Sequence, residues 1–395
     1  MKLPLAGLRV LDLGSVVFAP YCSQWLADLG ADVIKIEAPE GDSTRLTGPA
    51  LERGMSALYL GCNRSKRGIV LDLKTADGRD ALARLVDGAD VLLHSIRPQK
   101  LAALGLASEA LLARNPRLIV ANLLGFGADG PYAGLPAYDD IIQGMSGMAD
   151  LMAQKTGAPQ YLPTIMADKV SGLTAAIAIL AAVVRRTSTG AGGTVEVPMF
   201  ETMVAFNLVE HFYGHQFEPP LGPLGYARAM APWRRPLPTA DGHLCLMPYT
   251  NAHWRGFFTV AEAPQHIEDP RFADIGTRTS HIEPLYAIAA DLVAARPTAW
   301  WLAALEAAQV PSAPMIALDA LESDPHLAAT GFFQSLDTPS GTLKYPGVPV
   351  KFDGQRPPIA PPPHLGEHTV AVLTEAGFSE EDIAALLASR AARAG

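Results

Sequence analysis

The stretch LRVLDLGSVVFAPYCSQWLADLGADVIKIE (residues 8–37) decides the fold, because it predicts a strand, a helix and a second strand in continuous sequence. LRVLDL (8–13) and ADVIKIE (31–37) are apolar runs with the length and composition of buried strands. The segment between them has helical character from about Ala19, and Pro20 falls in the first turn, where a missing N–H costs nothing. The stretch therefore predicts a β-α-β unit.

The same alternation continues along the first half of the chain. A helical pattern from Thr75 to Val86 lies among further predicted strands at GIVLDL (68–73), DVLLHS (90–95), RLIVANLLG (117–125) and GGTVEVPMF (192–200). Strands that alternate with helices are typical of a parallel sheet built from β-α-β units. We therefore predict an α/β fold with a mainly parallel, doubly wound sheet, in which ligands bind at the carboxyl ends of the strands.

The second half has a different composition. A stretch rich in proline, glycine and aromatic residues runs from His211 to Pro248, and helical patterns follow between His281 and Gln309. This change predicts a smaller α+β domain. PPIAPPPHLGEH (357–368) predicts a stiff, extended connector. Two short helices are predicted after it, the second starting near Ser379.

Composition excludes several classes of protein. The chain has 395 residues, 49% hydrophobic, so it can bury a sizeable core, and its net charge of −9 argues against a nucleic-acid partner. Three cysteines, far apart and not in C-x-x-C spacing, suggest neither a disulfide framework nor a metal site. No signal-peptide pattern is visible, and the longest apolar run, 172–184, falls short of the roughly 20 residues that span a bilayer. We therefore expect a cytoplasmic protein without a membrane partner.

Asp168 stands at the predicted start of an apolar, alanine-rich helix within YLPTIMADKVSGLTAAIAILAAVVRR (161–186). One interpretation is structural, because aspartate is a favoured N-cap and a buried helix needs one. The other is functional, because a carboxylate in an apolar pocket near helix N–H groups is available as a nucleophile. The two interpretations are compatible. Gly172, inside the helix, favours the functional one, since glycine lets another group approach the backbone closely.

A loop rich in glycine and proline, LLGFGADGPYAGLPAYDD (123–140), follows one of the predicted strands. Its G-x-G-x-x-G spacing resembles a dinucleotide fingerprint, but no helical pattern follows directly, so we interpret the match as false. The more plausible role of this loop is to bring Tyr138 and Asp139 toward a ligand.

Two basic clusters interrupt the acidic chain, CNRSKRGIVLDLKT (62–75) and RPQK (97–100). Together they supply six cations: Arg64, Lys66, Arg67, Lys74, Arg97 and Lys100. One interpretation is solvated turns, and the other is a patch that receives phosphates at one edge of a parallel sheet. No metalloprotease, serine-hydrolase or P-loop motif occurs, so we predict no metal site.

Taken in order, these motifs resemble the class III coenzyme A transferases, which include formyl-CoA transferase and carnitine CoA-transferase, with α-methylacyl-CoA racemases as relatives. The resemblance covers nearly the whole chain. In the first part of the chain it is carried by residues 8–37 with Pro39, Gly41 and Asp42 after them, by NRSKRGIVLDLKT (63–75), and by the I-R-P-x-x-L-x-x-L-G run at 96–105. Further along, the matching motifs are GFGADGPY, YDDIIQGMSG, M-A-D-x-x-S-G-L-T-A-A, and VPSAPM (310–315) with DPH (324–326).

The resemblance implies an architecture. Family members have a large Rossmann-like domain built from both ends of the chain, joined to a smaller domain by long crossing segments. Two chains interlock as a homodimer. On this basis we predict a large CoA-binding domain, a crossing linker and a small α+β domain with the bounds 1–200 plus 335–395, 201–225 and 226–334.

The resemblance also implies a reaction in which CoA moves from an acyl-CoA donor to a small carboxylic acid, with no cofactor permanently bound. Asp168 matches the family's catalytic aspartate, which would form an anhydride and then an aspartyl-CoA thioester. Five residues match the family's CoA contacts and one comes from the loop described above, which gives the predicted set Val17, Phe18, Leu71, Lys74, Arg97 and Tyr138.

The chain also departs from the family pattern. Ala38 and Ala103 stand where some transferases carry CoA-binding arginines, and MPYTNAHW (247–254) replaces the glycine-rich loop of formyl-CoA transferase. The acids exchanged are not specified by the sequence. Six aromatic residues could build an apolar acyl pocket or belong to the core: Phe212, Tyr213, Tyr226, Trp233, Trp254 and Phe257.

Two alternative functions remain open. A racemase needs two bases beside the substrate α-carbon, one of them a histidine beside the position of Tyr138, and the run Ala137-Tyr138-Asp139-Asp140 contains none. Tyrosine, with an unperturbed pKa of about 10, is a poor base at neutral pH, although Asp139 or Asp140 could replace it. The other alternative is a non-catalytic CoA-binding protein, which would not need the carboxylate of Asp168.

Overall fold

The computed structural model describes residues 2–104 and 106–395, so Gly105, the last residue of the 96–105 motif, lies outside the described residues. The chain forms two compact units. The larger unit comprises Met1–Gly147, Tyr161–Phe206 and His326–Gly395, and the smaller comprises Met148–Gln160 and Asn207–Pro325.

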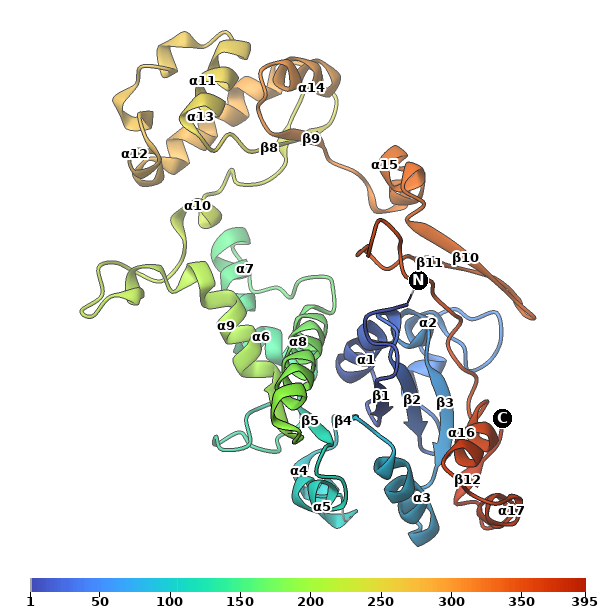
Figure 1. The fold of residues 1–395 in the computed structure, drawn as a ribbon. Helices are drawn as coiled ribbons and strands as arrows, with labels where there is room; N and C mark the ends of the chain where they lie inside the picture. The colour runs from blue at the N-terminus through green and yellow to red at the C-terminus, as the bar shows by residue number, and fades with distance from the viewer. Residues whose placement is uncertain (1, 105) are drawn as a thin grey trace. The chain divides into compact units, whose positions relative to one another are not determined.

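The larger unit is built on a seven-stranded sheet with the order β12-β3-β2-β1-β4-β5-β6 (Figure 1). Its strands are β1 (Arg9–Asp12), β2 (Asp32–Glu37), β3 (Arg67–Leu71), β4 (Val91–His94), β5 (Ile119–Leu124), β6 (Gly193–Pro198) and β12 (Ala392–Arg393). The first six are mutually parallel, and β12 pairs antiparallel with β3. The predicted α/β fold with a mainly parallel sheet is confirmed.

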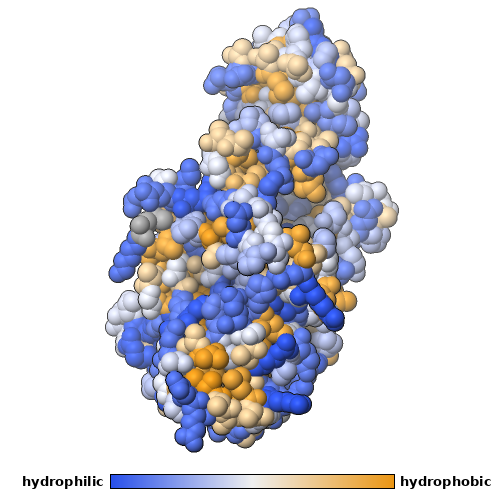
Figure 2. Space-filling model, turned by 90° about the vertical axis from the view of Figure 1, so that its right-hand side faces the viewer, coloured by the Kyte–Doolittle hydropathy of each residue, from blue (hydrophilic) through white to orange (hydrophobic). Residues whose placement is uncertain are grey.

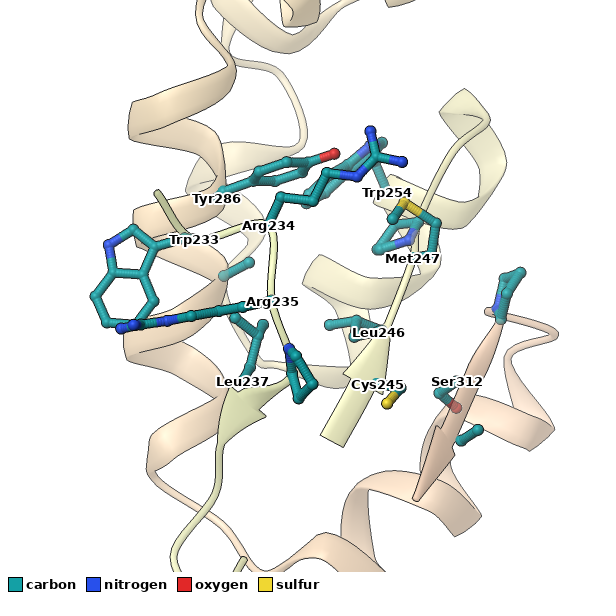
Figure 3. Close-up of a pocket in the computed structure, with 15 residues that line it drawn as sticks. Trp233, Arg234, Arg235, Leu237, Cys245, Leu246, Met247, Trp254, Tyr286 and Ser312 are labelled. Carbon is teal, nitrogen blue, oxygen red and sulfur yellow. The ribbon is translucent and has the colours of Figure 1, made fainter. Parts of the chain in front are cut away.

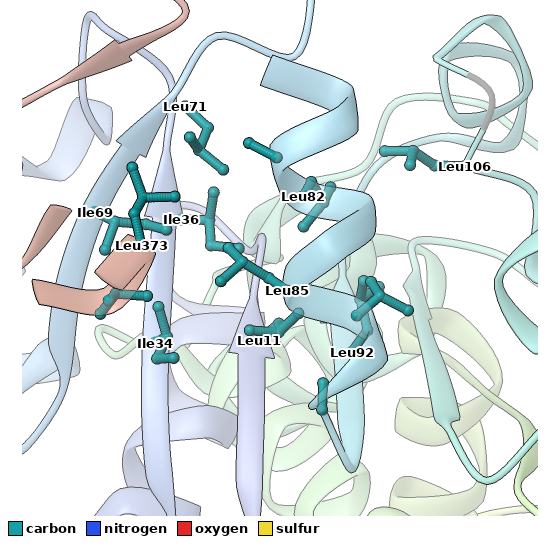
Figure 4. Packing of buried hydrophobic residues seen from close by; sticks show 14 of the residues in the cluster. Leu11, Ile34, Ile36, Ile69, Leu71, Leu82, Leu85, Leu92, Leu106 and Leu373 are labelled. Atoms are coloured by element: carbon teal, nitrogen blue, oxygen red, sulfur yellow. The ribbon is translucent and has the colours of Figure 1, made fainter. Parts of the chain in front are cut away.

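Helices cover both faces of this sheet, which explains why its strands read as continuous apolar runs. Successive side chains of a strand point to opposite faces, so Leu11, Ile34 and Ile69 share one face. There they meet Leu82 and Leu85 of α3 (Ala76–Asp87), as Figure 4 shows. The same cluster takes side chains from α5 (Ser108–Arg114), α16 (Thr369–Glu375) and α17 (Glu380–Ala388).

The other long helices, α1 (Phe18–Asp28) and α8 (Met166–Thr189), pack against each other and against the sheet. A methyl group on Gly172 of α8 would lie 3.0 Å from the carbonyl oxygen of Phe18 and 3.1 Å from the ring of Tyr21. Gly172 therefore serves the close crossing of the two helices, and it gives no support to the functional interpretation of Asp168. Among the described residues, only α8 has the length and apolar composition of a membrane span.

Two helices begin within one residue of their predicted starts. Thr75 precedes α3, and its hydroxyl accepts a hydrogen bond from the N–H of Gly78 at 3.0 Å. Ser379 precedes α17 and likewise accepts from the N–H of Asp382 at 3.1 Å. The remaining elements of the larger unit are α2 (Ala57–Asn63), α4 (Pro98–Ala103), α6 (Asp139–Met145), α15 (Pro325–Ala329) and the hairpin β10 (Phe333–Thr338) with β11 (Gly341–Pro346).

The smaller unit combines an antiparallel sheet with helices, so the predicted α+β character is confirmed. The sheet consists of β7 (Leu237–Pro238), β8 (His243–Leu246) and β9 (Ser312–Pro314). The helices are α7 (Met148–Thr156), α10 (Ala227–Met230), α11 (Asn251–Val260), α12 (Ile275–Ser280), α13 (Ile282–Ala294) and α14 (Thr298–Ala307). Aromatic rings fill its core, where Phe257 stacks on Trp301 and meets Trp254 edge-on.

Three segments divide differently from the predicted domain bounds. One of them is 326–334, which the sequence prediction assigned to the small domain and the structure places with the larger unit. The sequence prediction assigned 148–160 to the large domain, whereas the structure places it with the smaller unit, where Lys155 of α7 donates hydrogen bonds to the carbonyl oxygens of Ala229 and Ala231. The first part of the predicted linker, 201–211, belongs to helix α9 (Met199–His211), which begins in the larger unit and ends in the smaller. On the face seen in Figure 2, hydrophilic residues predominate and apolar residues form a patch in the lower part of the view.

Candidate active site

The strand order reverses at β1, whose neighbours are β2 on one side and β4 on the other. At such a switch point the connections leave in opposite directions and open a crevice beyond the carboxyl ends of the strands. A cavity of about 390 Å³ lies there, which we call the Asp168 cavity. Its lining comes from the segments after β1, β4 and β5 and from α8, and includes Val16, Phe18, Arg97, Lys100, Tyr138 and Asp168.

A second cavity of about 510 Å³, the Lys74 cavity, lies beyond the ends of β1, β2 and β3. It is lined by Ala38, Leu71 and Lys74. Lys100 lines both cavities, as do Leu13, Ser15 and Ile96, so the two form adjoining parts of one crevice. The structure thus brings most of the predicted ligand-contacting residues to one edge of the sheet.

Asp168 occupies the third position of α8, because the helix begins at Met166 and the N-cap position belongs to Ile165. The interpretation of Asp168 as an N-cap is therefore wrong. The cap is supplied instead by Asp139, whose Oδ1 accepts a hydrogen bond from the backbone N–H of Asp168 at 3.0 Å. This arrangement leaves the Asp168 carboxylate, 7% exposed, directed to the cavity that it lines.

Asp139 is itself held in place by Gln143, one turn further along α6. The side-chain amide of Gln143 donates to Asp139 Oδ2 at 2.6 Å, and its Oε1 accepts from the N–H of Leu162 at 2.9 Å. These hydrogen bonds join α6, and with it the loop 123–140, to the segment that leads into α8. Sequence reasoning missed Gln143, although its spacing of four residues from Asp139 permits contact on one helix face.

The environment of Asp168 raises its pKa from 3.8 to about 7. The main cause is burial, which disfavours the charged form, and the second is the negative charge of Asp139. A carboxylate with a pKa near 7 is poorly solvated, yet it is still substantially ionised at neutral pH. This combination is typical of residues that carry out chemistry.

The turn after β1 is held in a strained conformation beside the Asp168 cavity. Val16 has a φ of 67°, in the left-handed region that a β-branched residue rarely adopts. Its backbone N–H donates to both carboxylate oxygens of Asp42, at 3.2 and 3.3 Å. A methyl group on Gly14 would lie 2.3 Å from the Cβ of Ala19, so this turn requires glycine.

Buried ion pairs lie beneath the turn. Lys35 donates to Asp42 and to the carbonyl oxygen of Gly14, both at 3.0 Å, and Lys66 donates to Asp12 at 3.1 Å. Burial alone would raise the pKa of Asp12, but the charges of Lys66 and Lys35 overcome this effect and lower it. The ends of β1 and β2 are therefore fixed by charge–charge contacts inside the protein.

These contacts correct the phosphate interpretation of the first basic cluster. Its first three cations have internal partners: Arg64 pairs with Asp28, Lys66 with Asp12, and Arg67 with Asp32 and Glu375. They fix the fold, and the interpretation was wrong for them. Lys74, Arg97 and Lys100 are exposed and line the two cavities, so these three are available to an anionic ligand.

The other predicted site residues lie as follows. Leu71 ends β3 in the Lys74 cavity, and Phe18 lines the Asp168 cavity from the start of α1. Tyr138 is 68% exposed at its rim, whereas Val17 is buried and lines neither cavity. Ala38 lines the Lys74 cavity, and the side chain of Ala103 lies outside the description. Among the described residues, no cluster of three metal-ligating side chains occurs.

The fold and this crevice define an α/β protein with a ligand site at the switch point of its sheet. Residues 5–369 match the profile of CoA-transferase family III. The chain is 34% identical to succinate–glutarate CoA-transferase of Agrobacterium fabrum over 95% of this chain and 96% of that protein. It is 30% identical to formyl-CoA:oxalate CoA-transferase of Escherichia coli, with 98% and 99% covered.

Solved structures agree with this assignment. A mutant of Rv3272 from Mycobacterium tuberculosis superposes with a TM-score of 0.83 at 30% identity, covering 94% of this chain and 98% of that one. A CAIB/BAIF family protein from Brucella suis gives a TM-score of 0.79 at 32% identity, with 95% and 100% covered. The chain belongs to CoA-transferase family III and is a CoA-transferase of that family.

The raised pKa of Asp168 predicts a pH-dependent stability. The folded state binds this proton more tightly than the unfolded state, so the contribution is fully present below about pH 4 and is lost as pH rises through about 7. At about 1.4 kcal/mol per pKa unit, Asp168→Asn should be more stable than the parent by up to about 4 kcal/mol at about pH 8. Urea unfolding at several pH values measures this difference.

The matched control is Asp140→Asn, since Asp140 is the exposed neighbour of Asp139. It should show no pH-dependent gain. Equal stability of Asp168→Asn and the parent at about pH 8 would contradict the raised pKa.

Proposed function

We propose that the protein transfers CoA from an acyl-CoA donor to a small carboxylic acid through covalent intermediates on Asp168. The observation that carries this proposal is the buried carboxylate of Asp168, which faces a cavity whose rim bears exposed cations. A pure binding protein would not need a carboxylate in this place, because burying it beside Asp139 opposes its ionisation.

In the proposed reaction, an Asp168 carboxylate oxygen attacks the thioester carbonyl of the donor. The C–S bond breaks, and a mixed anhydride and CoA thiolate result. The thiolate then attacks the aspartyl carbonyl of the anhydride, which releases the donor acid and leaves an aspartyl-CoA thioester. The acceptor carboxylate reverses both steps and restores Asp168. Because the thioester energy stays on the protein, no permanently bound cofactor is required.

The poor solvation of Asp168 supports its role as the nucleophile. A carboxylate in water is stabilised by its hydration shell and attacks carbonyl groups weakly, whereas a buried one has lost that shell. The N-terminal turn of α8 offers partial positive charge beside it, which opposes full protonation. Asp139 is a positioning residue, because it fixes the start of α8 and contributes to the raised pKa of Asp168.

We place CoA along the crevice, with its phosphates near Lys74, Arg97 and Lys100. These are exposed cations in an acidic protein, and they line the Asp168 and Lys74 cavities. Leu71 and Phe18 provide apolar walls. A cytoplasmic location, where acyl-CoA esters are made and used, stays a prediction.

The racemase alternative finds less support in the site. Both Asp139 oxygens accept hydrogen bonds from the protein, and neither Asp139 nor Asp140 lines the Asp168 cavity. His94 ends β4 but lies outside the lining of both cavities, and burial lowers its pKa to about 4, which makes it a weak base. The second base that a racemase requires is therefore absent from the described lining of the cavity.

We expect Asp168→Ala to lower transfer by at least about three orders of magnitude, because it removes the covalent nucleophile. Incubation of the parent with acyl-CoA alone, followed by hydroxylamine or borohydride, should leave a mass change on the peptide around Met166 to Lys169. Asp140→Ala is the matched control and should retain both transfer and trapping. Rapid exchange of the substrate α-hydrogen with deuterium, without any trapped adduct, would instead indicate a racemase.

CoA affinity should fall as ionic strength rises, because exposed cation–phosphate contacts are screened over about 10 Å at 0.1 M salt. Lys74→Ala and Arg97→Ala should each weaken binding further and reduce this salt dependence. Arg117→Ala is the control, since Arg117 is an exposed arginine that precedes β5 at the opposite edge of the sheet. CoA affinity is measured by calorimetry. If neither Lys74→Ala nor Arg97→Ala changed it, the proposed position of the CoA phosphates would be wrong.

We also propose that two chains assemble as a homodimer. The larger unit exposes five large apolar side chains on α8 and α6, which contact each other: Leu173, Ile177, Val184, Ile141 and Met145. Apolar patches of this kind mark interaction surfaces in water-soluble proteins. Sedimentation should therefore give the mass of two chains, and Ile177→Asp should shift it toward one. A single-chain mass for the parent would contradict the proposal.

A further inference from the structure

Two buried carboxyl groups lie close together at the start of α8. Asp168 is 7% exposed and lines the Asp168 cavity, and Asp139, 9% exposed, lies outside the lining and contacts the backbone of Asp168. Like charges repel strongly where water is scarce, so two such groups do not both ionise easily. Carboxyl pairs of this kind share a proton, and the environment of each member decides which one holds it.

The smaller unit has an apolar cavity of about 490 Å³ that holds no such pair (Figure 3). Trp233 and Trp254, two of the aromatic residues singled out in the sequence, line it, whereas Phe257 lies in the core. Arg234 and Arg235 are charged, and none of the described residues in this lining is acidic. An apolar wall disfavours a carboxylate, because burial removes the hydration of the charged form. The pair at the start of α8 therefore needs a feature that stabilises one member in its charged form.

Gln143 of α6 distinguishes the two carboxyl groups. It is fully buried, and its side-chain nitrogen donates to Asp139 Oδ2 at 2.6 Å. The same nitrogen donates to the carbonyl oxygen of Thr164 at 3.2 Å, and the side-chain oxygen accepts from the N–H of Leu162 at 2.9 Å. A backbone carbonyl can only accept and a backbone N–H can only donate, so these two contacts fix the orientation of the amide. Asp139 Oδ2 therefore faces a hydrogen-bond donor.

The other oxygen of Asp139 faces a donor as well. Oδ1 accepts from the backbone N–H of Asp168 at 3.0 Å, in the first turn of α8. A proton on either oxygen of Asp139 would point at a donor, whereas the charged form satisfies both contacts. The side-chain oxygens of Asp168, by contrast, accept no hydrogen bond from the described residues. The surroundings thus favour the charged form of Asp139 and offer no such support to Asp168.

We propose that Gln143 decides which member of this pair holds the proton: it keeps Asp139 charged, so that Asp168 is the one that gains and loses it. Gln143 is then a positioning residue, because it acts on Asp168 through Asp139 and lines neither cavity. The charge of Asp139 is also one of the two causes that raise the pKa of Asp168 to about 7. The consequence for catalysis rests on the proposed function, since only the deprotonated form of Asp168 can attack a thioester.

Other titratable groups around Asp168 do not supply this control. Burial raises the pKa of the thiols of Cys22 on α1 and Cys62 on α2, so both stay neutral. Lys169 donates to the hydroxyl of Thr164 at 2.6 Å. Among the described residues, none of the remaining groups forms a hydrogen bond with either carboxyl group of the pair. They are Arg97, Lys100 and Tyr138 in the cavity lining, Tyr21 and Asp28 on α1, Asp140 on α6 and Glu196 on β6.

The test follows the carboxyl carbons of carbon-13-labelled aspartate by NMR as pH is varied, in the full chain without substrate. Asp168→Asn and Asp139→Asn each remove one signal and thereby assign it. In the parent, the Asp168 signal should titrate near pH 7, and the Asp139 signal should remain that of a carboxylate over the same range. This measurement decides the inference even if a variant at Gln143 does not fold.

Gln143→Met keeps the length of the side chain and removes the donor to Asp139 Oδ2. The two carboxyl groups should then compete for the proton, and their titrations should approach each other by at least about one pH unit, since a hydrogen bond to a charged group contributes about one to two units. Gln154→Met is the matched control, because Gln154 donates to Asp150 at 2.6 Å with the same spacing on the exposed face of α7. It should leave both titrations unchanged.

Two outcomes would overturn the inference: titration of Asp139 instead of Asp168 near pH 7 in the parent, or titrations in Gln143→Met that match the parent. The pH profile of kcat/KM adds a readout that a role in packing would not move. Packing alone would lower kcat/KM equally at every pH, whereas Gln143→Met should keep more of its maximal kcat/KM on the acidic side than the parent. The proposed function fails separately, because the expected NMR titrations without any trapped adduct on Asp168 would refute the covalent mechanism alone.

Discussion

Two buried ion pairs, Lys35 with Asp42 and Lys66 with Asp12, are the constraint on which the carboxyl edge of the parallel sheet depends. Each charge is desolvated, so removing one partner would leave the other unpaired at a cost of about 3–5 kcal/mol. Asp42 also accepts from the N–H of Val16, and the pairs therefore hold both the strand ends and a strained turn of the cavity wall. A hydrophobic replacement would fill the same space without fixing that turn.

Asp168, like the turn after β1, is held in place by residues that are distant from it in the sequence. Its helix is capped by Asp139 from another segment, and Gln143 fixes Asp139 in turn. A cap from a distant residue frees the Asp168 side chain, which a local N-cap role would have turned back onto its own backbone. Asp139 thus serves the structure, and its negative charge adds to the burial that raises the pKa of Asp168.

Lys74, Arg97 and Lys100 stay exposed at the sheet edge of the larger unit, where they line the two cavities. Ammonium and guanidinium groups form charge-assisted hydrogen bonds with phosphates, and this is the physical basis on which we propose that these three cations meet the phosphates of CoA.

The sequence by itself determined the β-α-β alternation, the parallel sheet and the position of Asp168 at a helix start, because apolar periodicity and helix-start signals are local. Only the tertiary structure decided which charged residues are free. Arg64, Lys66 and Lys74 look alike in one basic cluster, yet the first two are paired internally and the third lines a cavity. The acceptor of an ion pair can stand anywhere in the chain, so charge compensation is settled by three-dimensional neighbours rather than by spacing.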